Sequence, residues 1–295
     1  MTDGVTFTRT KQKLTWLITG CSSGLGLSLV RAVQKAGHKV IATSRNPSKT
    51  PDLVQEIESK DGKWLKLDVD SPYCGNIVDE LEKSGEEVDV LVNNAGYSVY
   101  SPIETTTEEE VRAQMETVFF GPLRLIRAVL PYQRKRKFGI IVNCSSGASL
   151  EAQGSMGAYA GAKGGLDALT KVLAKEVAPF NIRVITVVLG TFNTNMLNSY
   201  VFGKTPLPEE YKDTVAGHIM SYIASGKVVP NGDKDKAAKA IYQLVVGEGF
   251  GAGKEAERLL PLGSDMTTRM TLVQDQLAHA KEVFGDITNN VGIDK

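Results

Sequence analysis

A short apolar run, a glycine-rich turn and a helical pattern follow one another near the start of the chain. The run at 14–19 predicts a strand, and apolar residues recur at helical spacing from Leu25 to Ala36, before Gly37 ends the helix. The turn at 19–26 reads Thr-Gly-Cys-Ser-Ser-Gly-Leu-Gly, and it lets backbone N–H groups and the positive helix end approach a pyrophosphate. Such turns also occur without a ligand, but the position after the first strand favours nucleotide binding.

The rest of the chain alternates short apolar runs with helical patterns, which is typical of a parallel sheet with crossover helices. The chain has 295 residues, 42% of them hydrophobic, which suits one large core. The predicted fold class is α/β: a Rossmann-type, doubly wound parallel sheet of about seven strands with helices on both faces. We expect further strands at 39–43, 64–67, 88–92, 140–144, 183–189 and near 259–262, and helices at 52–59, 73–83, 107–130 and 158–178.

No repeat or low-complexity linker divides the chain, so we expect a single domain. We assign residues 1–13 to a polar amino-terminal tail, 14–270 to the Rossmann domain and 271–295 to a carboxyl-terminal helical extension. Residues 190–233 depart from the alternation and combine aromatic side chains with prolines and charges. We expect this stretch to form a substrate-binding loop or lid, and an ordinary surface excursion is the alternative.

The charge balance and the cysteine content of the chain limit which ligands, metal sites and cellular compartments we expect. Basic and acidic residues both number 34, and this formal net charge of zero favours neither nucleic acid nor an anionic membrane. The three cysteines and three histidines lack metal-ligand spacing, so we expect no metal site and a reducing compartment. Without a signal-peptide core or a transmembrane-length stretch, the chain is predicted to be cytoplasmic. The basic run at 134–137 is interpreted as a solvated loop, with nuclear targeting as the alternative.

Tyr159 and Lys163 stand four residues apart in a segment of helical pattern. Side chains at this spacing share one face of a helix, about 6 Å apart along its axis. A nearby cation lowers the pKa of a phenol, which would suit Tyr159 to general acid or base catalysis. Ser146 follows the apolar run at 140–144, at the strand end where open α/β sheets bind ligands. A Tyr and a Lys at this spacing also arise by chance, and the glycine-rich turn favours the functional interpretation.

The glycine-rich turn at 19–26, Ser146, Tyr159 and Lys163 occur in the order that is typical of the short-chain dehydrogenase/reductase family. The chain resembles this family from Leu14 to about Leu262. Within the family it is similar to fungal and 17β-hydroxysteroid-dehydrogenase-like members. The resemblance implies hydride transfer between a nicotinamide dinucleotide and a carbonyl or alcohol, with Tyr159 as proton donor. Ser146 would hydrogen-bond the same oxygen, and Lys163 would bind the nicotinamide ribose. The cofactor contacts it implies are Thr19, Gly20, Ser22, Ser23, Gly24, Leu25, Gly26, Ser44, Arg45, Asp68, Val69, Asn94, Ala95, Gly96, Tyr159, Lys163, Gly190, Phe192 and Thr194.

The end of the second predicted strand indicates which dinucleotide binds. Family members that prefer NAD place an acidic residue there for the ribose 2′-hydroxyl, and its carboxylate would repel a phosphate. Here Ser44 stands at that position with Arg45 beside it, and a guanidinium matches a 2′-phosphate in charge and geometry. We therefore predict NADP(H) as the cofactor, and Arg45 as an ordinary surface cation is the alternative.

The aromatic and apolar residues of 190–233 indicate a fairly apolar small-molecule substrate. A steroid, fatty-acyl, polyketide or other secondary-metabolite carbonyl would fit. We expect substrate contacts from Tyr97, Phe192, Met196 and Tyr200.

Two positions depart from the family pattern. Val118 stands where many members carry an Asn that helps hold a water near the Lys, and Leu189 replaces the usual Pro before Gly190. Val118 supports a second hypothesis, in which the protein binds NADP(H) without redox turnover, as a cofactor sensor or as a scaffold for isomerisation or cyclisation, and the retained Ser146, Tyr159 and Lys163 oppose it.

The helix of Tyr159 also carries small residues at Gly164, Gly165 and Ala168. Family members often form dimers or tetramers through this helix, so we expect a homodimer or homotetramer. Packing of the small residues inside one subunit is the alternative.

Overall fold

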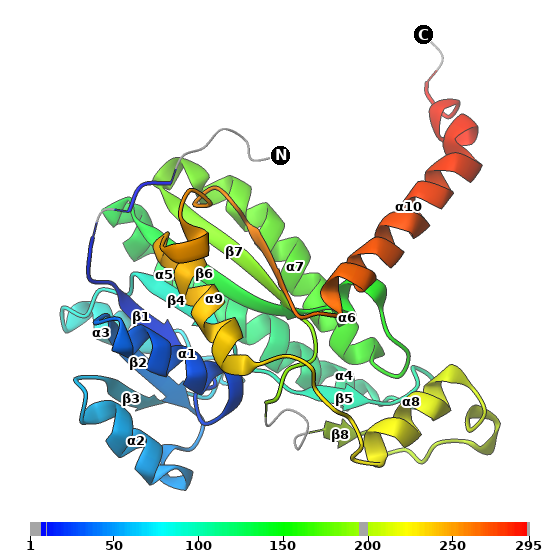
Figure 1. Ribbon diagram of the computed structural model, residues 1–295, viewed down its shortest axis with the longest axis horizontal. Coiled ribbons are helices and arrows are strands. Elements are labelled where there is room, and N and C mark those ends of the chain that lie inside the picture. Colours follow the sequence, from blue (N-terminus) through cyan, green and yellow to red (C-terminus); the bar gives the residue numbers. More distant parts are fainter. Residues whose placement is uncertain (1–6, 10, 195–199, 294–295) are drawn as a thin grey trace.

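The computed structural model describes residues 7–9, 11–194 and 200–293, and within them seven strands form one parallel sheet in the order β3-β2-β1-β4-β6-β7-β9 (Figure 1). The order reverses between β1 and β4, which makes the carboxyl ends of these strands a topological switch point. This sheet confirms the predicted fold class. Its strands are β1 (Thr15–Ile18), β2 (Lys39–Ser44), β3 (Lys63–Lys66), β4 (Val90–Asn93), β6 (Gly139–Ser146), β7 (Ile182–Leu189) and β9 (Leu259–Leu262).

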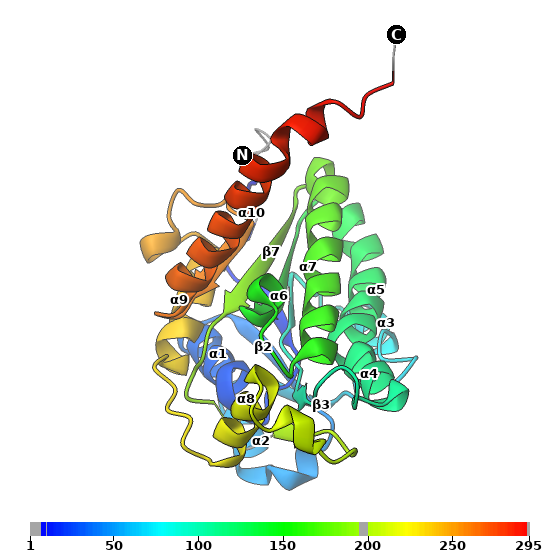
Figure 2. The same cartoon turned by 90° about the vertical axis from the view of Figure 1, so that its right-hand side faces the viewer.

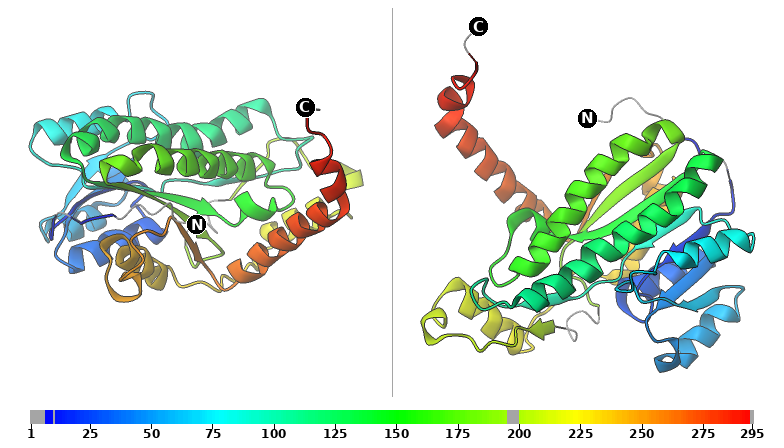
Figure 3. Two further views of the ribbon diagram at one scale, coloured as in Figure 1. Left: turned by 90° about the horizontal axis from the view of Figure 1, so that it is seen from above. Right: turned by 180° about the vertical axis from the view of Figure 1, so that it is seen from behind.

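Helices cover both faces of the sheet (Figure 3, left). Neighbouring strand residues point to opposite faces, so Trp16 and Ile18 join one apolar cluster and Leu17 joins the other. Residues of α1 (Gly24–Lys35), α2 (Pro51–Glu58) and α9 (Lys234–Val246) pack in the first cluster. Residues of α3 (Asn76–Lys83), α5 (Gly121–Arg136) and α7 (Gly157–Val177) pack in the second.

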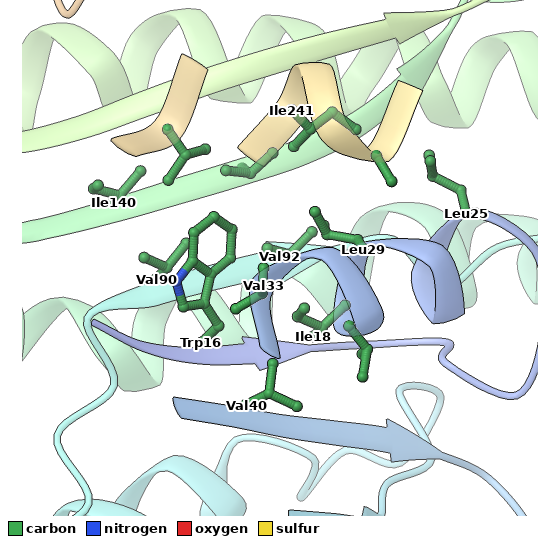
Figure 4. Close-up of a cluster of buried hydrophobic side chains, with 14 of the residues drawn as sticks. Trp16, Ile18, Leu25, Leu29, Val33, Val40, Val90, Val92, Ile140 and Ile241 are labelled. Carbon is green, nitrogen blue, oxygen red and sulfur yellow. The ribbon is translucent and has the colours of Figure 1, made fainter. Parts of the chain in front are cut away.

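The first cluster shows why the sheet and α1 are fixed against each other. Trp16 is fully buried between strand residues such as Val90 and the α1 residues Leu29 and Val33 (Figure 4). Ile241 of α9 closes the same cluster from above. Burying side chains of this size stabilises a fold by roughly 1.5–3 kcal/mol each, so the strand that leads into the glycine-rich turn is firmly held.

A second, two-stranded parallel sheet pairs β5 (Ser98–Tyr100) with β8 (Tyr200–Phe202). The sequence did not predict it, because each strand is three residues long and its partner lies about a hundred residues away. The other helices are α4 (Glu108–Met115), α6 (Ala148–Glu151), α8 (Val215–Ala224) and α10 (Met266–Asn289), with a π-helix at Glu116–Phe120 and single 3-10 turns at Pro47–Lys49, Ala178–Phe180, Glu209–Tyr211 and Gly249–Gly251.

The basic run at 134–137 is not the solvated loop that the sequence suggested. α5 continues through Pro131 to Arg136, and Arg136 forms an ion pair with Glu82 at 2.6 Å and donates to the Val88 carbonyl oxygen at 3.1 Å. Pro131 is exposed, so the backbone hydrogen bond it removes lies on the water-facing side of the helix. Basic side chains also stabilise the carboxyl end of a helix dipole.

Candidate active site

A cavity of ≈ 480 Å³ lies at the carboxyl ends of the central strands. The β1–α1 turn, the end of β2 and the loop after β4 form one part of its wall. The end of β6, the start of α7 and the segment after β7 form another, and α8 and Arg269 of α10 complete it. The cavity therefore opens at the switch point of the sheet, where doubly wound folds bind ligands.

The glycine-rich turn packs tightly against the loop after β4. Gly20 has a φ of +72°, and a Cβ there would lie 2.8 Å from the Ala95 Cα. A Cβ at Gly26 would lie 2.5 Å from the Gly20 carbonyl oxygen and 2.6 Å from Asn94 Nδ2. No side chain caps the first turn of α1, and Ser23 precedes it in extended conformation. Because the cavity reaches this uncapped helix end, the turn fits a dinucleotide pyrophosphate.

Two of the predicted cofactor residues, Thr19 and Gly26, support the cavity wall without lining it. Thr19 Oγ1 accepts hydrogen bonds from the backbone N–H groups of Asn94 and Ala95, both at 3.0 Å. The Asn94 amide donates back to the Thr19 carbonyl oxygen at 2.9 Å. These contacts hold Asn94, Ala95 and Gly96 along the cavity, where the sequence predicted them.

The end of β2 brings Ser44 and Arg45 to the cavity. The Ser44 hydroxyl accepts a hydrogen bond from Trp64 Nε1 at 3.0 Å and is buried, whereas Arg45 is exposed. Val69, a predicted cofactor residue, lines the cavity. Asp68 is exposed and does not line the cavity, and its carboxylate accepts a hydrogen bond from the Asp70 backbone N–H at 3.1 Å.

Ser146, Tyr159 and Lys163 meet in the same cavity. β6 ends at Ser146, and the first turns of α7 place Tyr159 and Lys163 on one buried face. Lys163 Nζ lies 5.8 Å from the centre of the Tyr159 ring and donates to the Cys144 carbonyl oxygen at 2.5 Å. The three predicted catalytic side chains are thus brought together opposite the glycine-rich turn.

The pKa of Tyr159 differs from the sequence expectation. We expected the Lys163 ammonium to lower this pKa, but burial raises it to about 12, and a hydrogen bond with the Ser146 side chain offsets only part of the rise. Burial also lowers the pKa of Lys163. The physical reason is desolvation, which penalises a phenolate and an ammonium alike, while the Lys163 ammonium is directed at the Cys144 carbonyl. The phenol therefore keeps its proton at neutral pH.

A buried polar group supports the position of Ser146. The Ser149 hydroxyl of α6 lies 2.7 Å from the Ser146 carbonyl oxygen and 2.6 Å from Asp167 Oδ2 of α7. Asp167 is buried one turn beyond Lys163, and its Oδ1 atom has no hydrogen-bond partner among the described residues. Burial is the larger influence on both pKa values, raising that of Tyr159 and lowering that of Lys163, and the Asp167 charge acts to raise each of them.

Three of the four predicted substrate residues, Tyr97, Phe192 and Tyr200, line the cavity. The fourth, Met196, lies outside the described residues. The segment after β7 also brings Gly190 and Thr194, two predicted cofactor residues, to the cavity. Further apolar lining comes from residues that the sequence analysis missed: Tyr100, Met156, Ile219, Tyr222, Ile223 and Val228.

The spacing of apolar residues in the sequence could have indicated part of this cavity wall. Ile219, Tyr222 and Ile223 recur at helical spacing on one face of α8. Tyr100 meets Tyr200 edge-to-face, with ring centres 5.1 Å apart, and this contact depends on the unpredicted pairing of β5 with β8. Arg269 reaches the cavity from α10, and no local pattern indicates its ion pairs with Glu151 at 2.7 Å and Asp265 at 2.9 Å.

The described part of the chain offers neither a cluster of metal ligands nor a membrane-spanning helix. Nowhere in it do three His, Cys, Asp or Glu side chains gather as a metal ion would require. None of its helices has the length and hydropathy needed to cross a bilayer.

The family model, two relatives and a crystal structure relate this chain to the same kind of protein. The family model described as short chain dehydrogenase matches residues 15–203. Oxidoreductase claN of Passalora fulva is 40% identical over 181 residues, which are 61% of this chain and 83% of that protein. A 3-ketodihydrosphingosine reductase of Bacteroides thetaiotaomicron is 35% identical over 236 residues, 78% of this chain and 82% of that protein. The crystal structure of a short-chain dehydrogenase from Streptomyces avermitilis matches with a TM-score of 0.84 at 32% identity, covering 96% of this chain and all of that one.

Proposed function

The chain belongs to the short-chain dehydrogenase/reductase family, and we propose that it is an NADP(H)-dependent oxidoreductase that reduces a ketone or aldehyde of a fairly apolar small molecule, or oxidises the alcohol. One observation carries this proposal: Ser146, Tyr159 and Lys163 share a cavity with the glycine-rich turn and the uncapped start of α1. Acid–base groups and a pyrophosphate cradle in one cavity suit carbonyl chemistry beside a dinucleotide.

The dinucleotide, when bound, supplies or accepts the hydride. Tyr159 carries the proton that the substrate oxygen needs, and its raised pKa keeps that proton in place at neutral pH. Ser146 is placed to hydrogen-bond the same oxygen as its charge develops. Lys163 would hold the nicotinamide ribose.

The choice of NADP(H) is supported by the end of β2. Arg45 is exposed at the cavity, and its neighbour Ser44 offers no carboxylate that would repel a 2′-phosphate. The apolar wall of Tyr100, Met156 and Ile219 supports an apolar substrate.

We further propose a homodimer or homotetramer that uses the α7 face. Cβ atoms at Gly161 and Gly164 would meet no described atom within 4 Å, and Val172 on the same helix is exposed. The three cysteines are free thiols in the structure, which supports a reducing compartment such as the cytoplasm.

Turnover with NADPH tests the central proposal. The absorbance of NADPH is followed with a panel of apolar ketones and aldehydes, and the reverse reaction with the matching alcohols and NADP. We expect turnover by the wild type, and we expect Tyr159→Phe to lower kcat by roughly 10²–10⁴-fold while the Kd for NADPH stays nearly unchanged. Tyr73→Phe is the matched control, because this exposed tyrosine lies outside the cavity.

Two outcomes would contradict the proposal. Undiminished activity in Tyr159→Phe would remove the phenol from the reaction. Tight NADPH binding without oxidation or reduction across the panel would favour the second hypothesis, a protein that binds the dinucleotide without redox turnover.

A further inference from the structure

α10 projects from the body of the protein and is anchored only near its start (Figures 1 and 2). Met266 is 2% exposed, and Arg269 ties the first turn to α6 through Glu151. Further along, large apolar side chains face solvent: Leu277 is 66% exposed, Phe284 55% and Ile287 63%. An apolar stripe of this length on a projecting helix indicates an interaction surface.

Most apolar residues of α10 follow a heptad pattern, and Leu272, Ala278 and Val283 lie off it. From Met266 to Ile287 the spacing of the heptad residues alternates between four and three residues over three heptads, and this is the pattern of a helix that packs along another helix. The acidic residues Asp275 and Glu282 fall at the positions farthest from the stripe. The stripe consists of Met266, Met270, Val273, Leu277, Ala280, Phe284 and Ile287.

Local propensity alone gives α10 little support. Gly285 interrupts the helix interior, and threonines occupy four of its positions, including Thr271 and Thr288. Both residue types lower helix stability, and most helices in proteins depend on packing against an apolar face. A helix of 24 residues, roughly 36 Å long, would therefore gain stability from a packing partner along its stripe.

We propose that α10 pairs with α10 of a second copy of this chain as an antiparallel two-helix coiled coil. In the antiparallel register that aligns the two stripes, Leu277 faces the partner's Ala280, and Phe284 faces the partner's Val273. Each layer then joins a larger side chain to a smaller one, as close packing requires. A parallel pair would place alanine on alanine and phenylalanine on phenylalanine in separate layers, leaving one layer underfilled and the other crowded.

Charge is compatible with the same arrangement. The positions that flank the stripe include Gln274, Gln276, Lys281 and Val283. Of these four residues, Lys281 is charged. In the antiparallel register Lys281 faces the partner's Gln274, so no like charges meet across the seam. The two bodies lie at opposite ends of the helix pair, which separates them. This inference concerns assembly and does not depend on the proposed reaction.

The mass of the full chain in solution tests the proposal. We compare wild type with the double variant Leu277→Gln and Phe284→Gln by light scattering coupled to gel filtration. We expect the mass of the double variant to be half that of wild type. Leu272→Gln is the matched control, because Leu272 is 57% exposed on α10 but lies off the stripe, and its mass should equal that of wild type.

Disulfide cross-linking tests the orientation and needs no destabilising change. The native cysteines Cys21, Cys74 and Cys144 are buried, so introduced thiols on α10 react separately. We expect a mixture of Phe284→Cys and Val273→Cys chains to form the mixed disulfide. Phe284→Cys alone should not cross-link, since its two copies would lie about 16 Å apart along the axis.

Three results would overturn the proposal. A monomeric wild type would remove the pairing, and an unchanged mass in the double variant would place any interface elsewhere, such as on α7. Cross-linking of Phe284→Cys with itself, without the mixed product, would show a parallel pair or a different surface.

Discussion

Tyr159 is held in a setting that favours its neutral form. The phenol is buried in an apolar cluster with Tyr100 and Met156, and the nearby Asp167 carboxylate adds to the rise in its pKa. A hydrogen bond with the Ser146 hydroxyl lowers the pKa of Tyr159, but this effect is weaker than that of burial. As a result, the residue is suited to give a proton to a developing alkoxide more readily than to remove one from an alcohol.

This asymmetry predicts how the two reaction directions depend on pH. Reduction needs the protonated phenol, which persists below its pKa of about 12, so kcat/KM for reduction should show no loss from this group through the neutral range. Oxidation needs the phenolate, so its kcat/KM should rise about tenfold per pH unit up to that pKa. Steady-state profiles in both directions measure this. A break near neutral pH in the oxidation profile would show that Lys163 lowers the phenol pKa after all.

At the scale of elements, the site depends on how α6 and α7 are joined. Ser149 of α6 lies between the Ser146 carbonyl and the Asp167 carboxylate of α7, so the chain segment that carries Ser146 is tied to the helix that carries Tyr159 and Lys163.

The π-helix before α5 forms another part of the surroundings of the site. Val118 is fully buried there, and a side chain at Gly96 would meet its Cγ2 at 3.8 Å. An apolar side chain thus lies where the family resemblance suggested an Asn.

Asp167→Asn separates the charge of this link from its hydrogen bond. The amide oxygen of Asn can still accept from Ser149, but the negative charge that raises the pKa of Tyr159 and Lys163 is lost. We expect the pH-dependent rise in kcat/KM for oxidation to move to lower pH, while the Kd for NADPH stays nearly unchanged. The Cys144 thiol would act on Tyr159 and Lys163 in the same direction if it were charged, but it stays protonated because burial raises its pKa.

The control for this variant is Glu176→Gln, an exposed charge on the same helix. Loss of activity in Asp167→Asn without any shift of the pH profile would assign Asp167 a purely structural role.

At the scale of the whole molecule, the cavity joins parts of the chain that are far apart in sequence. The turn before α1, the end of β2 and the start of α7 all contribute to it, and so does α8. A ligand that contacts these elements together stabilises the folded state, because the unfolded chain cannot assemble the site.

Thermal unfolding therefore measures cofactor preference. At a hundredfold excess over its Kd, a ligand adds about 2.7 kcal/mol of stability, so NADPH should raise Tm by several degrees and NADH by less at equal concentration. Arg45→Glu should weaken NADPH binding about 10–100-fold, as expected for a lost charge-assisted contact, and leave NADH binding nearly unchanged. Arg127→Glu, an exposed arginine on α5, is the control. Equal shifts from NADPH and NADH in the wild type would remove Arg45 from cofactor selection.

The sequence alone determined the parallel sheet, because the spacing of apolar residues and the positions of glycines specify strands, helices and turns within a few neighbouring residues. For the same reason the four-residue spacing of Tyr159 and Lys163 was sufficient to place both on one face of a helix. Their roles in the reaction stay predictions. Tertiary structure decided what depends on distant neighbours: the end of α5, which Glu82 supports, the β5–β8 pairing and the arrival of Arg269. It also reversed the expected pKa shift of Tyr159, since desolvation depends on everything that packs around a side chain, and no local pattern contains that information.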